Sequence, residues 1–409
     1  MKYYFRFAGC VMIQRHILPI LLARAAQWPV VTVTGPRQSG KTTLCREAFP
    51  NKPYTNLERP DTRDFARTDP RGFLSQFPEG AVIDEIQRVP DLLSWIQVLV
   101  DEKNTAGQFI LTGSHQFELS RHISQSLAGR TALLKLLPLS IAELLPIVEK
   151  PTLDDFLYQG GYPRIHAQQL DPAVALGDYF ETYVQRDLRE LVQLRNLHLF
   201  EKFVRLVAGR VGQLVNMQSL AADVGVSGNT VQEWLTLLEA SYIVFRLPPW
   251  FSNGSKRLIK SPKLYFYDVG LAAWLMGITQ PAYLPTHPLR GNLFENLVVL
   301  EVLKTLHNAG AKPNLSFYRD ANHNEADLLL ETGDKLQLLE IKSAQTVASD
   351  AMQAATRVKT ALGERVAGMT LVYGGAEAQR RSAFEVLPYT QVRAWVDGLS
   401  SFSCYSISM

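Results

Sequence analysis

The sequence predicts an α/β protein of several domains, with a mostly parallel sheet in the first third, a helical middle region and a second α/β domain at the C-terminus. Between about Pro29 and Pro146, short β-branched runs alternate with stretches long enough for crossover helices, the pattern of a parallel sheet covered on both faces. From Pro172 to about Leu247 the pattern is mainly helical. After Gln280 an amphipathic helix, predicted from Leu293 to Leu306, is followed by three short strand-like runs. The 409 residues suffice for roughly two to four domains at about 150 residues each.

The composition is that of a globular protein without a strong overall charge. The 42 Lys and Arg residues against 39 Asp and Glu give a net charge of +3, so contact with nucleic acid needs a local basic patch. With 46% hydrophobic and 20% charged residues, the composition excludes wholesale disorder. The three cysteines, Cys10, Cys45 and Cys404, have no metal-ligand spacing, which disfavours a zinc site or a disulfide framework.

We do not expect the first twelve residues to act as a targeting signal. Phe7 to Cys10 is similar to a lipid-attachment box, but Arg6 interrupts an apolar run that is too short for a signal peptide. Met12 is an alternative start to Met1. Because no run approaches the roughly 18 to 20 apolar residues of a membrane span, we expect a cytoplasmic protein with no membrane partner.

The strongest motif is GPRQSGKT, which follows the strand-like run VVTVT and opens a helix. It matches GxxxxGK[ST], whose backbone amides close around phosphate oxygens at a helix N-terminus. Lys41 would neutralise the β- and γ-phosphates and Thr42 would ligate Mg2+. We therefore expect ATP and Mg2+ as ligands. The predicted nucleotide-binding residues here are Gly35, Pro36, Arg37, Gln38, Ser39, Gly40, Lys41, Thr42 and Thr43.

Two carboxylates follow at the end of a second strand-like run, AVIDE. Asp84 is suited to support the Mg2+ ion, and Glu85 is suited to act as the general base that polarises the attacking water. The next run, QFILTGS, ends in Thr112 and Ser114, which would sense the γ-phosphate or hold the water. Plain strand-end hydroxyls are the alternative for this pair.

These three runs, together with SLAGR before the next strand, resemble the AAA-type P-loop ATPases. The resemblance implies that an arginine before that strand acts in trans on the γ-phosphate of a neighbouring subunit, which makes Arg130 the candidate and Arg121 its rival. It also implies a homo-oligomer. The turn at Gly160 to Pro163 is similar to a G-x-P element that contacts nucleotide in signalling ATPases, so Pro163 is a further nucleotide-binding candidate; an ordinary turn is the alternative.

The segment Met217 to Ala240 predicts a helix-turn-helix, with Gly225 in the turn and Ser227 capping the second helix. A strand-like run and a wing-like loop follow, so we expect a winged-helix-like region. DNA contact through phosphates and use as a protein-protein module both remain open, because the second helix offers no Arg or Lys to base edges. The predicted DNA-binding residues of this region are Arg246, Lys256, Arg257, Lys260 and Lys263.

Near the C-terminus two strand-like runs flank Gly333-Asp334, a favoured hairpin turn. In that register Asp327 faces Glu340 and Glu325 faces Lys342, with directly opposed Cβ atoms about 5 Å apart. Two opposed carboxylates repel each other, and a divalent cation is the usual compensation. A solvated hairpin with a Glu325–Lys342 ion pair is the alternative.

This hairpin looks like the D…E-x-K core of the restriction-endonuclease-like nucleases. The resemblance implies that Asp327 and Glu340 hold Mg2+, with Mn2+ as an alternative ion, and that Lys342 orients or activates the water. Glu295, in the preceding helix, would complete the metal site. The same fold without catalysis is a further alternative.

The whole chain resembles prokaryotic AAA-type ATPases that carry a C-terminal nuclease-like domain, over roughly Arg15 to Tyr373. We therefore expect an ATP-hydrolysing ATPase coupled to a metal-dependent DNA nuclease-like domain. The rivals are a signalling ATPase whose nuclease-like domain is only a platform, and a protein-remodelling ATPase. The predicted domains are an extension (1–14), the P-loop ATPase domain (15–150), a helical connector (151–195), a winged-helix-like domain (196–280) and the restriction-endonuclease-like domain (281–409).

Overall fold

The computed structural model describes residues 6, 7, 10, 11, 13–103, 105–114, 125–184, 197–251 and 261–399. The chain divides into two compact units, which are described separately. Unit 1 comprises Met1–Leu139, Ala240–Tyr242 and His307–Gly310, and unit 2 comprises Ser140–Glu239, Ile243–Leu306 and Ala311–Met409.

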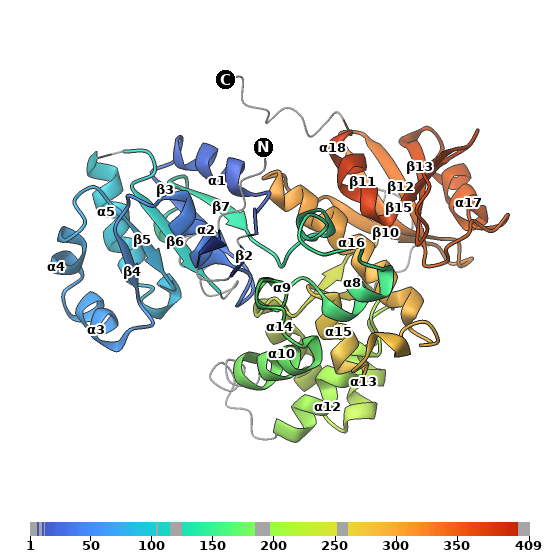
Figure 1. The fold of residues 1–409 in the computed structure, drawn as a ribbon, viewed down its shortest axis with the longest axis horizontal. Coiled ribbons are helices and arrows are strands. Elements are labelled where there is room, and N and C mark those ends of the chain that lie inside the picture. Colours follow the sequence, from blue (N-terminus) through green and yellow to red (C-terminus); the bar gives the residue numbers. More distant parts are fainter. Residues whose placement is uncertain are drawn as a thin grey trace. The chain divides into compact units, whose positions relative to one another are not determined.

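Unit 1 is built on a sheet of five parallel strands in the order β4-β5-β6-β3-β7 (Figure 1). The parallel α/β fold predicted for this part of the chain is confirmed. The strands are β3 (Val30–Thr34), β4 (Tyr54–Asn56), β5 (Ala81–Asp84), β6 (Phe109–Gly113) and β7 (Thr131–Lys135). The helices are α1 (Leu18–Ala25), α2 (Lys41–Ala48), α3 (Pro60–Thr68), α4 (Pro70–Ser75), the 3-10 turn η1 (Ile86–Arg88) and α5 (Leu92–Lys103), and a short hairpin pairs β1 (Arg6–Phe7) with β2 (Cys10–Val11).

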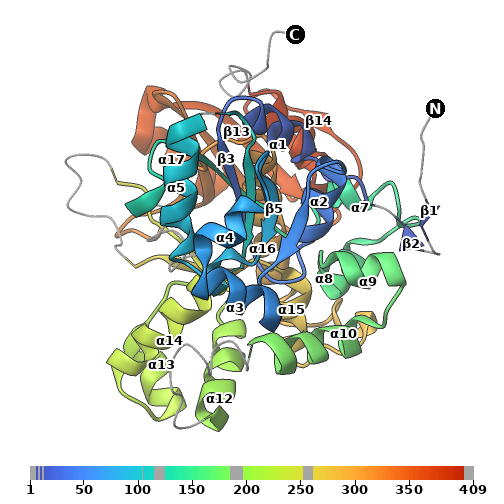
Figure 2. The ribbon, with the colours of Figure 1, turned by 90° about the vertical axis from the view of Figure 1, so that its left-hand side faces the viewer.

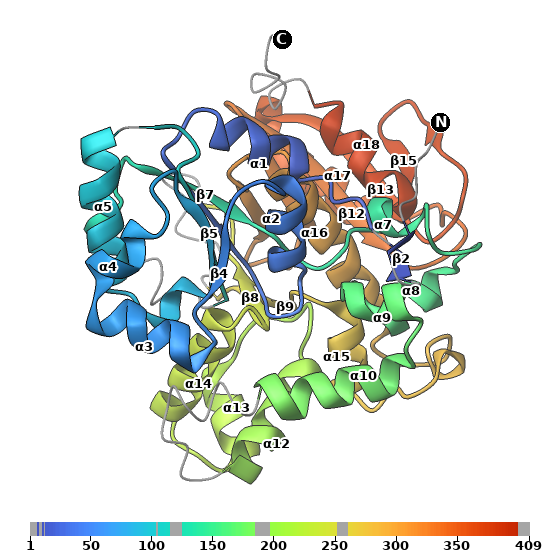
Figure 3. The same ribbon diagram turned by 60° about the vertical axis from the view of Figure 1, so that its left-hand side comes forward.

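Helices cover both faces of this sheet, because consecutive side chains of each strand point to opposite faces. Ile83 and Leu111 pack with α3, α4 and α5 in one apolar cluster. Val82 and Ile110 pack with α1 and α2 in the other. Figures 2 and 3 show the two helix layers on either side of the strands. Strands β3, β5 and β6 are thus buried on both faces, as strands of a covered parallel sheet are.

Unit 2 begins with short helices and a π-helical turn. They are α7 (Ile141–Leu144), α8 (Leu153–Gln159), α9 (Pro163–Gln168), α10 (Pro172–Tyr179) and η2 (Phe180–Val184). After α12 (Leu197–Ala208), the segment predicted as a helix-turn-helix forms α13 (Met217–Val224) and α14 (Gly228–Ala240). An antiparallel pair of strands follows, β8 (Val244–Leu247) and β9 (Lys263–Phe266). Gly225 ends α13 at a φ of 90°, and the Ser227 hydroxyl accepts the Thr230 amide at 3.1 Å. Both helices and this cap lie as predicted.

The C-terminal part of unit 2 is a mixed sheet in the order β10-β11-β12-β13-β15-β14. Gly333-Asp334 forms the predicted two-residue turn, and the ladder from Thr332–Lys335 to Leu328–Leu339 has the predicted register. The predicted pairs Asp327–Glu340 and Glu325–Lys342 lie beyond the last pair of this ladder. The strands are β10 (Leu315–Arg319), β11 (Glu325–Thr332), β12 (Lys335–Lys342), β13 (Val366–Tyr373), β14 (Gln379–Arg380) and β15 (Glu385–Pro388). The helices that follow Leu247 are α15 (Val269–Leu275), η3 (Pro281–Tyr283), α16 (Arg290–Asn308), α17 (Gln353–Leu362), η4 (Gly363–Arg365), η5 (Tyr389–Gln391) and α18 (Val392–Asp397).

Helix α16 differs from its predicted character. The sequence favoured an amphipathic helix, but eleven consecutive residues from Asn296 to Leu306 are buried, including Glu301 and Lys304. The polar side chains are therefore inside the protein and need partners there. In the described part of the chain, no helix combines the length and the apolar character that crossing a bilayer requires.

Candidate functional site

The phosphate loop joins β3 to α2 at the carboxyl edge of the sheet in unit 1, the edge at which open α/β sheets bind ligands. Gly35 has a φ of +149°, and a Cβ there would lie 2.0 Å from the Leu136 carbonyl oxygen. Gly40 caps α2 at a φ of 90°. Both glycines are required by the backbone, which brings the first amides of α2 to the loop.

Lys41 lies under this loop and is 5% exposed. Its Nζ donates to the carbonyl oxygens of Gly35 at 3.0 Å and Pro36 at 2.8 Å. Burial lowers the pKa of Lys41, although the nearby charges of Glu85 and Asp84 oppose that shift. The ammonium is therefore poorly compensated by these neighbours, and a phosphate would stabilise its charged form.

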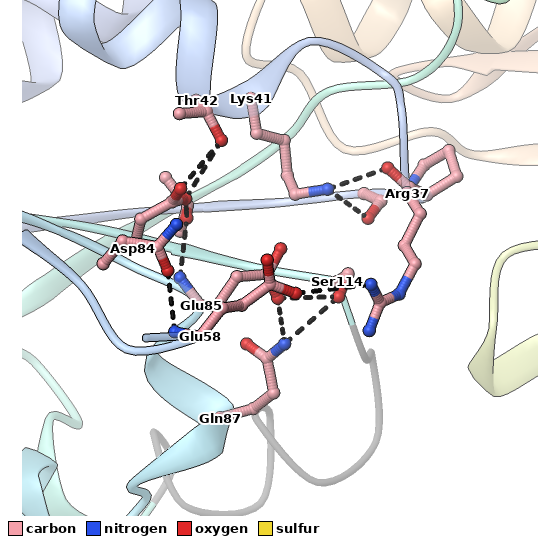
Figure 4. A network of polar contacts seen from close by, with 12 residues as sticks. Arg37, Lys41, Thr42, Glu58, Asp84, Glu85, Gln87 and Ser114 are labelled. Carbon is pink, nitrogen blue, oxygen red and sulfur yellow. Dashed lines mark hydrogen bonds and ion pairs between the residues drawn. The ribbon is translucent and has the colours of Figure 1, made fainter. Parts of the chain in front are cut away.

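Asp84 ends β5 and collects hydroxyl groups from three other segments. It is 3% exposed, and it accepts hydrogen bonds from Thr42 at 2.9 Å, from the Tyr54 phenol at 2.8 Å and from Thr112. Thr42 and Asp84 thus offer oxygen atoms side by side, which fits Mg2+ bound with substrate phosphates rather than by a protein cage. Figure 4 shows the Thr42–Asp84 contact next to Glu85.

Glu85 follows directly and has a φ of 58°, a conformation that costs a non-glycine residue about 1–3 kcal/mol. Its Oε2 accepts hydrogen bonds from Ser114 at 2.9 Å and from Gln87 (Figure 4). Burial pushes the pKa of Glu85 upward, but the charge of Lys41 and the two hydrogen bonds hold it below its ordinary value. The side chain is therefore ionised and held in one orientation, as a group that polarises water must be.

Three residues of this site were missed by the sequence reasoning. Gln87 bridges Glu85 and Ser114, to whose Oγ it donates at 3.1 Å, and Tyr54 supports Asp84. Arg15 donates to the backbone oxygens of Ser39 and Leu137, both at 2.7 Å, and so ties the loop to the segment that follows β7, the strand beside β3. Only tertiary contacts identify these residues, because none of them belongs to a motif.

Arg130 lies at the amino edge of the same sheet. Its carbonyl accepts the Val30 amide at the start of β3, whereas the phosphate loop follows the other end of that strand. Five residues at about 3.3 Å each put roughly 16 Å between these edges. The Arg130 guanidinium donates two hydrogen bonds to the Asp101 carboxylate, at 2.5 and 2.8 Å. The rival, Arg121, lies outside the described residues.

Pro163 begins α9 in unit 2, and its role toward nucleotide stays a prediction. The glycine turn before it is held within that unit, since the Gly161 amide donates to the buried carboxylate of Asp268 at 2.7 Å.

The basic patch needs a correction at Lys263. This residue is 3% exposed and its ammonium makes ion pairs with Glu295 and Glu325, so it is not a surface contact for phosphate. Arg246 is engaged by Glu239, at 2.6 and 2.7 Å. The other predicted members, Lys256, Arg257 and Lys260, lie outside the described residues.

Two of the carboxylates predicted at the C-terminal hairpin, together with one from α16, gather around that same lysine. We call Glu295, Glu325 and Asp327 the acidic cluster; their distances to Lys263 Nζ are 2.9, 2.6 and 3.8 Å. Asp327 Oδ2 accepts the Ile341 amide at 2.9 Å, just beyond the last ladder pair.

Glu340 is buried beside Asp327, and burial and then that charge raise its pKa. The Glu325–Lys342 ion pair of the alternative interpretation is not what forms: Glu325 contacts Lys263 and Arg319, while Lys342 contacts Glu340 at 2.6 Å. Within the described residues, no three His, Cys, Asp or Glu side chains are placed to hold a metal ion.

Comparison of the sequence with protein families identifies three consecutive regions. Residues 27–145 match an AAA domain, 150–282 match a domain of unknown function (DUF8612), and 290–392 match another (DUF4143). The uncharacterized protein Rv2008c of Mycobacterium tuberculosis is 33% identical over 343 residues, which cover 83% of this chain and 76% of that protein. An uncharacterized protein of Haemophilus influenzae is 26% identical over 306 residues, covering 67% and 74%.

Among solved structures, a Walker-type ATPase of Pyrococcus abyssi aligns with 64% of this chain and 96% of its own, at 16% identity and a TM-score of 0.43. RuvB of Thermotoga maritima aligns with 57% of this chain and 86% of its own, at 20% identity and a TM-score of 0.29.

Proposed function

Because the chain belongs to the same family as Rv2008c of Mycobacterium tuberculosis and carries an AAA domain around its phosphate loop, we propose that it is an ATP-hydrolysing switch. The observation that carries the proposal is the convergence of Lys41, Thr42, Asp84 and Glu85 at one edge of the parallel sheet. These groups supply a cation for phosphate, oxygen ligands for Mg2+ and a carboxylate for water, which are the parts that phosphoryl transfer to water requires.

Each residue then has a distinct role. Lys41 leaves the Gly35 and Pro36 carbonyls to contact the β- and γ-phosphates, while Thr42 and Asp84 hold Mg2+. Bound Mg2+ would supply charge neutralisation on the phosphate oxygens. Glu85 accepts the proton of the attacking water, and Ser114 and Gln87 fix its carboxylate for that transfer.

Self-association is part of this proposal. Arg130 lies at the sheet edge opposite its own phosphate loop, so it could meet a γ-phosphate only in a neighbouring subunit. To act there its guanidinium must leave Asp101. The proposed active form is therefore a homo-oligomer.

The test is a comparison of nucleotide binding with phosphate release in Glu85→Gln. We expect ATP affinity to stay within a few-fold of the parent and turnover to fall by about 10²–10⁴-fold, since only the proton acceptor is lost. Glu79→Gln, an exposed carboxylate of the same unit, is the matched control. Unchanged turnover in Glu85→Gln would refute the assignment.

A DNA partner is a further part of the proposal, supported by the helix pair α13 and α14 followed by the strand pair β8 and β9. With Lys263 buried, it depends on the basic segment before β9. Lys256→Glu with Arg257→Glu should weaken DNA binding and reduce its salt slope by roughly 0.9 for each phosphate that is no longer neutralised. If the charge-reversed variant binds DNA with the same affinity and the same salt slope as the parent, a protein-binding role for this region is favoured instead.

A metal-dependent nuclease is the second candidate, favoured by the proximity of Asp327, Glu340 and Lys342 at one strand end. Incubation of the protein with labelled single-stranded, duplex and branched DNA, with Mg2+ or Mn2+ and with or without ATP, tests it directly. Cleavage that is lost in Lys342→Ala would establish the nuclease. The absence of cleavage under every cation would leave the C-terminal domain as a binding platform.

A further inference from the structure

The acidic cluster already contains a cation that belongs to the chain. Lys263 is the first residue of β9, in the region that matches the first domain of unknown function, whereas the carboxylates come from α16 and β11 in the region that matches the second. Its Nζ lies 2.6 Å from Glu325 and 2.9 Å from Glu295, with Asp327 at 3.8 Å. An ammonium donates three hydrogens, so it can serve several carboxylates at once.

Other groups around Lys263 also contact the ammonium or the acidic cluster. The Tyr265 phenol, two residues along β9, donates to the same Glu295 oxygen at 2.5 Å. The Phe317 ring centre lies 5.5 Å from Nζ, within the range of a cation–π contact. Arg319 adds a second positive charge to Glu325 at 3.3 Å. Two cations, Lys263 and Arg319, thus contact the three carboxylates of the cluster, and Lys263, at 3% exposed, is the inner one.

This arrangement conflicts with the metal site implied by the resemblance to nucleases, and therefore with the metal-dependent nuclease given above as the second candidate function. Two of its three implied ligands, Glu295 and Asp327, are held by the Lys263 ammonium. A divalent ion between them would have to lie beside that positive charge or displace it. Displacement would leave an ammonium buried without its carboxylates, which is strongly unfavourable.

We propose that the ammonium of Lys263 is the resident cation of the acidic cluster, in the position where a nuclease of this fold would hold its divalent metal. The cluster then joins β9 to α16 and β11 as a buried ion-pair network. The carboxylates serve to bind a segment of the same chain, and the site excludes Mg2+ and Mn2+ by charge.

The test measures Mn2+ binding to the nucleotide-free full chain by calorimetry and electron paramagnetic resonance. Every protein carries Thr42→Ala, so that the nucleotide site contributes equally. In Lys263→Met, which keeps the aliphatic stem, we expect a new Mn2+ site at least tenfold tighter than the Mn2+ binding that the parent retains elsewhere. Adding Asp327→Asn should abolish the new site. Lys335→Met, an exposed lysine on β12, should not create one.

Two results would overturn the proposal: Mn2+ binding by the parent that disappears in Asp327→Asn, or a folded Lys263→Met that gains no site. If Lys263→Met does not fold, the proposal is tested by comparing Mn2+ binding of the parent with that of Asp327→Asn. Identical Mn2+ isotherms support the proposal, and a loss of binding in Asp327→Asn contradicts it. ATP turnover is measured separately, so failure of the proposed ATPase cannot be confused with failure here.

Discussion

The Thr42 hydroxyl donates to the Asp84 carboxylate at 2.9 Å, although the two residues are 42 positions apart. Thr42 is in the first turn of α2 and Asp84 is the last residue of β5, which does not neighbour β3 in the sheet. The contact therefore depends on the strand order, which places β6 between them and leaves the carboxyl ends of all three strands at one edge. Removal of the Thr42 hydroxyl therefore tests the predicted Mg2+ site directly.

Thr42→Ala should raise the Mg2+ concentration that ATP turnover requires. The substitution removes one oxygen from the ion and leaves the Asp84 carboxylate one hydrogen bond short, so the Mg2+ concentration for half-maximal turnover should rise about tenfold or more. Titration of turnover with Mg2+ at saturating ATP measures it. Thr105→Ala, an exposed threonine of the same unit, is the control, and an unaltered Mg2+ titration in Thr42→Ala would contradict the assignment.

Arg130 is predicted to act on a neighbouring subunit, which mixing experiments can detect. Arg130→Ala keeps a complete phosphate loop but lacks the arginine, while Lys41→Ala keeps the arginine and cannot bind phosphate. A mixture of the two should hydrolyse ATP faster than the sum of the separate proteins, because each supplies what the other lacks. Replacing the second partner by the double variant Lys41→Ala/Arg130→Ala should cancel the gain. A mixture that never exceeds the sum would place Arg130 outside catalysis.

Asp101 gives an independent measurement on the same arginine. Because its carboxylate holds the Arg130 guanidinium through two hydrogen bonds, Asp101→Asn should release the arginine without removing it. We expect turnover in Asp101→Asn to equal or exceed that of the parent at protein concentrations where subunits associate. Turnover as low as in Arg130→Ala would mean that the ion pair itself, rather than a free guanidinium, is needed.

Glu301 should make the stability of the protein depend on pH. It is buried in α16, its Oε2 accepts the Ile141 amide at 2.9 Å, and Lys304 lies 3.7 Å away. Burial raises the pKa of Glu301 to about 7, against the opposing charge of Lys304. The fold therefore favours the protonated form of Glu301, and this stabilises the protein fully below the unfolded pKa near 4.3. The stabilisation is lost as pH rises through about 7, and it amounts to on the order of 3 kcal/mol in total.

Glu301→Gln should remove this dependence, since glutamine keeps the acceptor and cannot ionise. The difference in midpoint temperature, variant minus parent, should increase from pH 5 to pH 8, because only the parent loses stability over this range. Thermal unfolding in one buffer series measures it. Glu364→Gln, at an exposed carboxylate, should follow the parent. If the midpoint temperatures of Glu301→Gln and the parent change in parallel with pH, Glu301 is already ionised in the folded protein at pH 5 and the prediction is wrong.

Gly35→Ala should destabilise unit 1. The added Cβ would meet the Leu136 carbonyl oxygen at 2.0 Å, and the backbone φ of +149° is one that alanine rarely adopts. We expect a loss of about 1–3 kcal/mol in the free energy of unfolding, together with weaker ATP binding. Gly228→Ala is the control, because a Cβ there meets no atom within 4 Å. Equal stability of the two variants would refute the steric argument.

The sequence by itself determined the parts whose chemistry is local. GPRQSGKT between a strand and a helix specifies the phosphate loop, and an apolar run ending in Asp84-Glu85 specifies a buried strand with two carboxylates at its end. The Gly333-Asp334 turn with period-two alternation also fixed the hairpin register, because a slip of one residue would turn the apolar side chains to the opposite face.

Tertiary structure alone decided which distant groups meet. Nothing near Lys263 in sequence distinguishes a buried lysine from one of a basic patch, and its position among Glu295, Glu325 and Asp327 arises from three segments that pack together. Gln87, Tyr54 and Arg15 joined the nucleotide site in the same way. The local sequence pattern specifies the backbone conformation and the apolar faces of an element. The partner of a buried charge depends instead on which other element packs beside it in the fold. That partner determines whether a group of buried carboxylates forms a metal site or an ion pair.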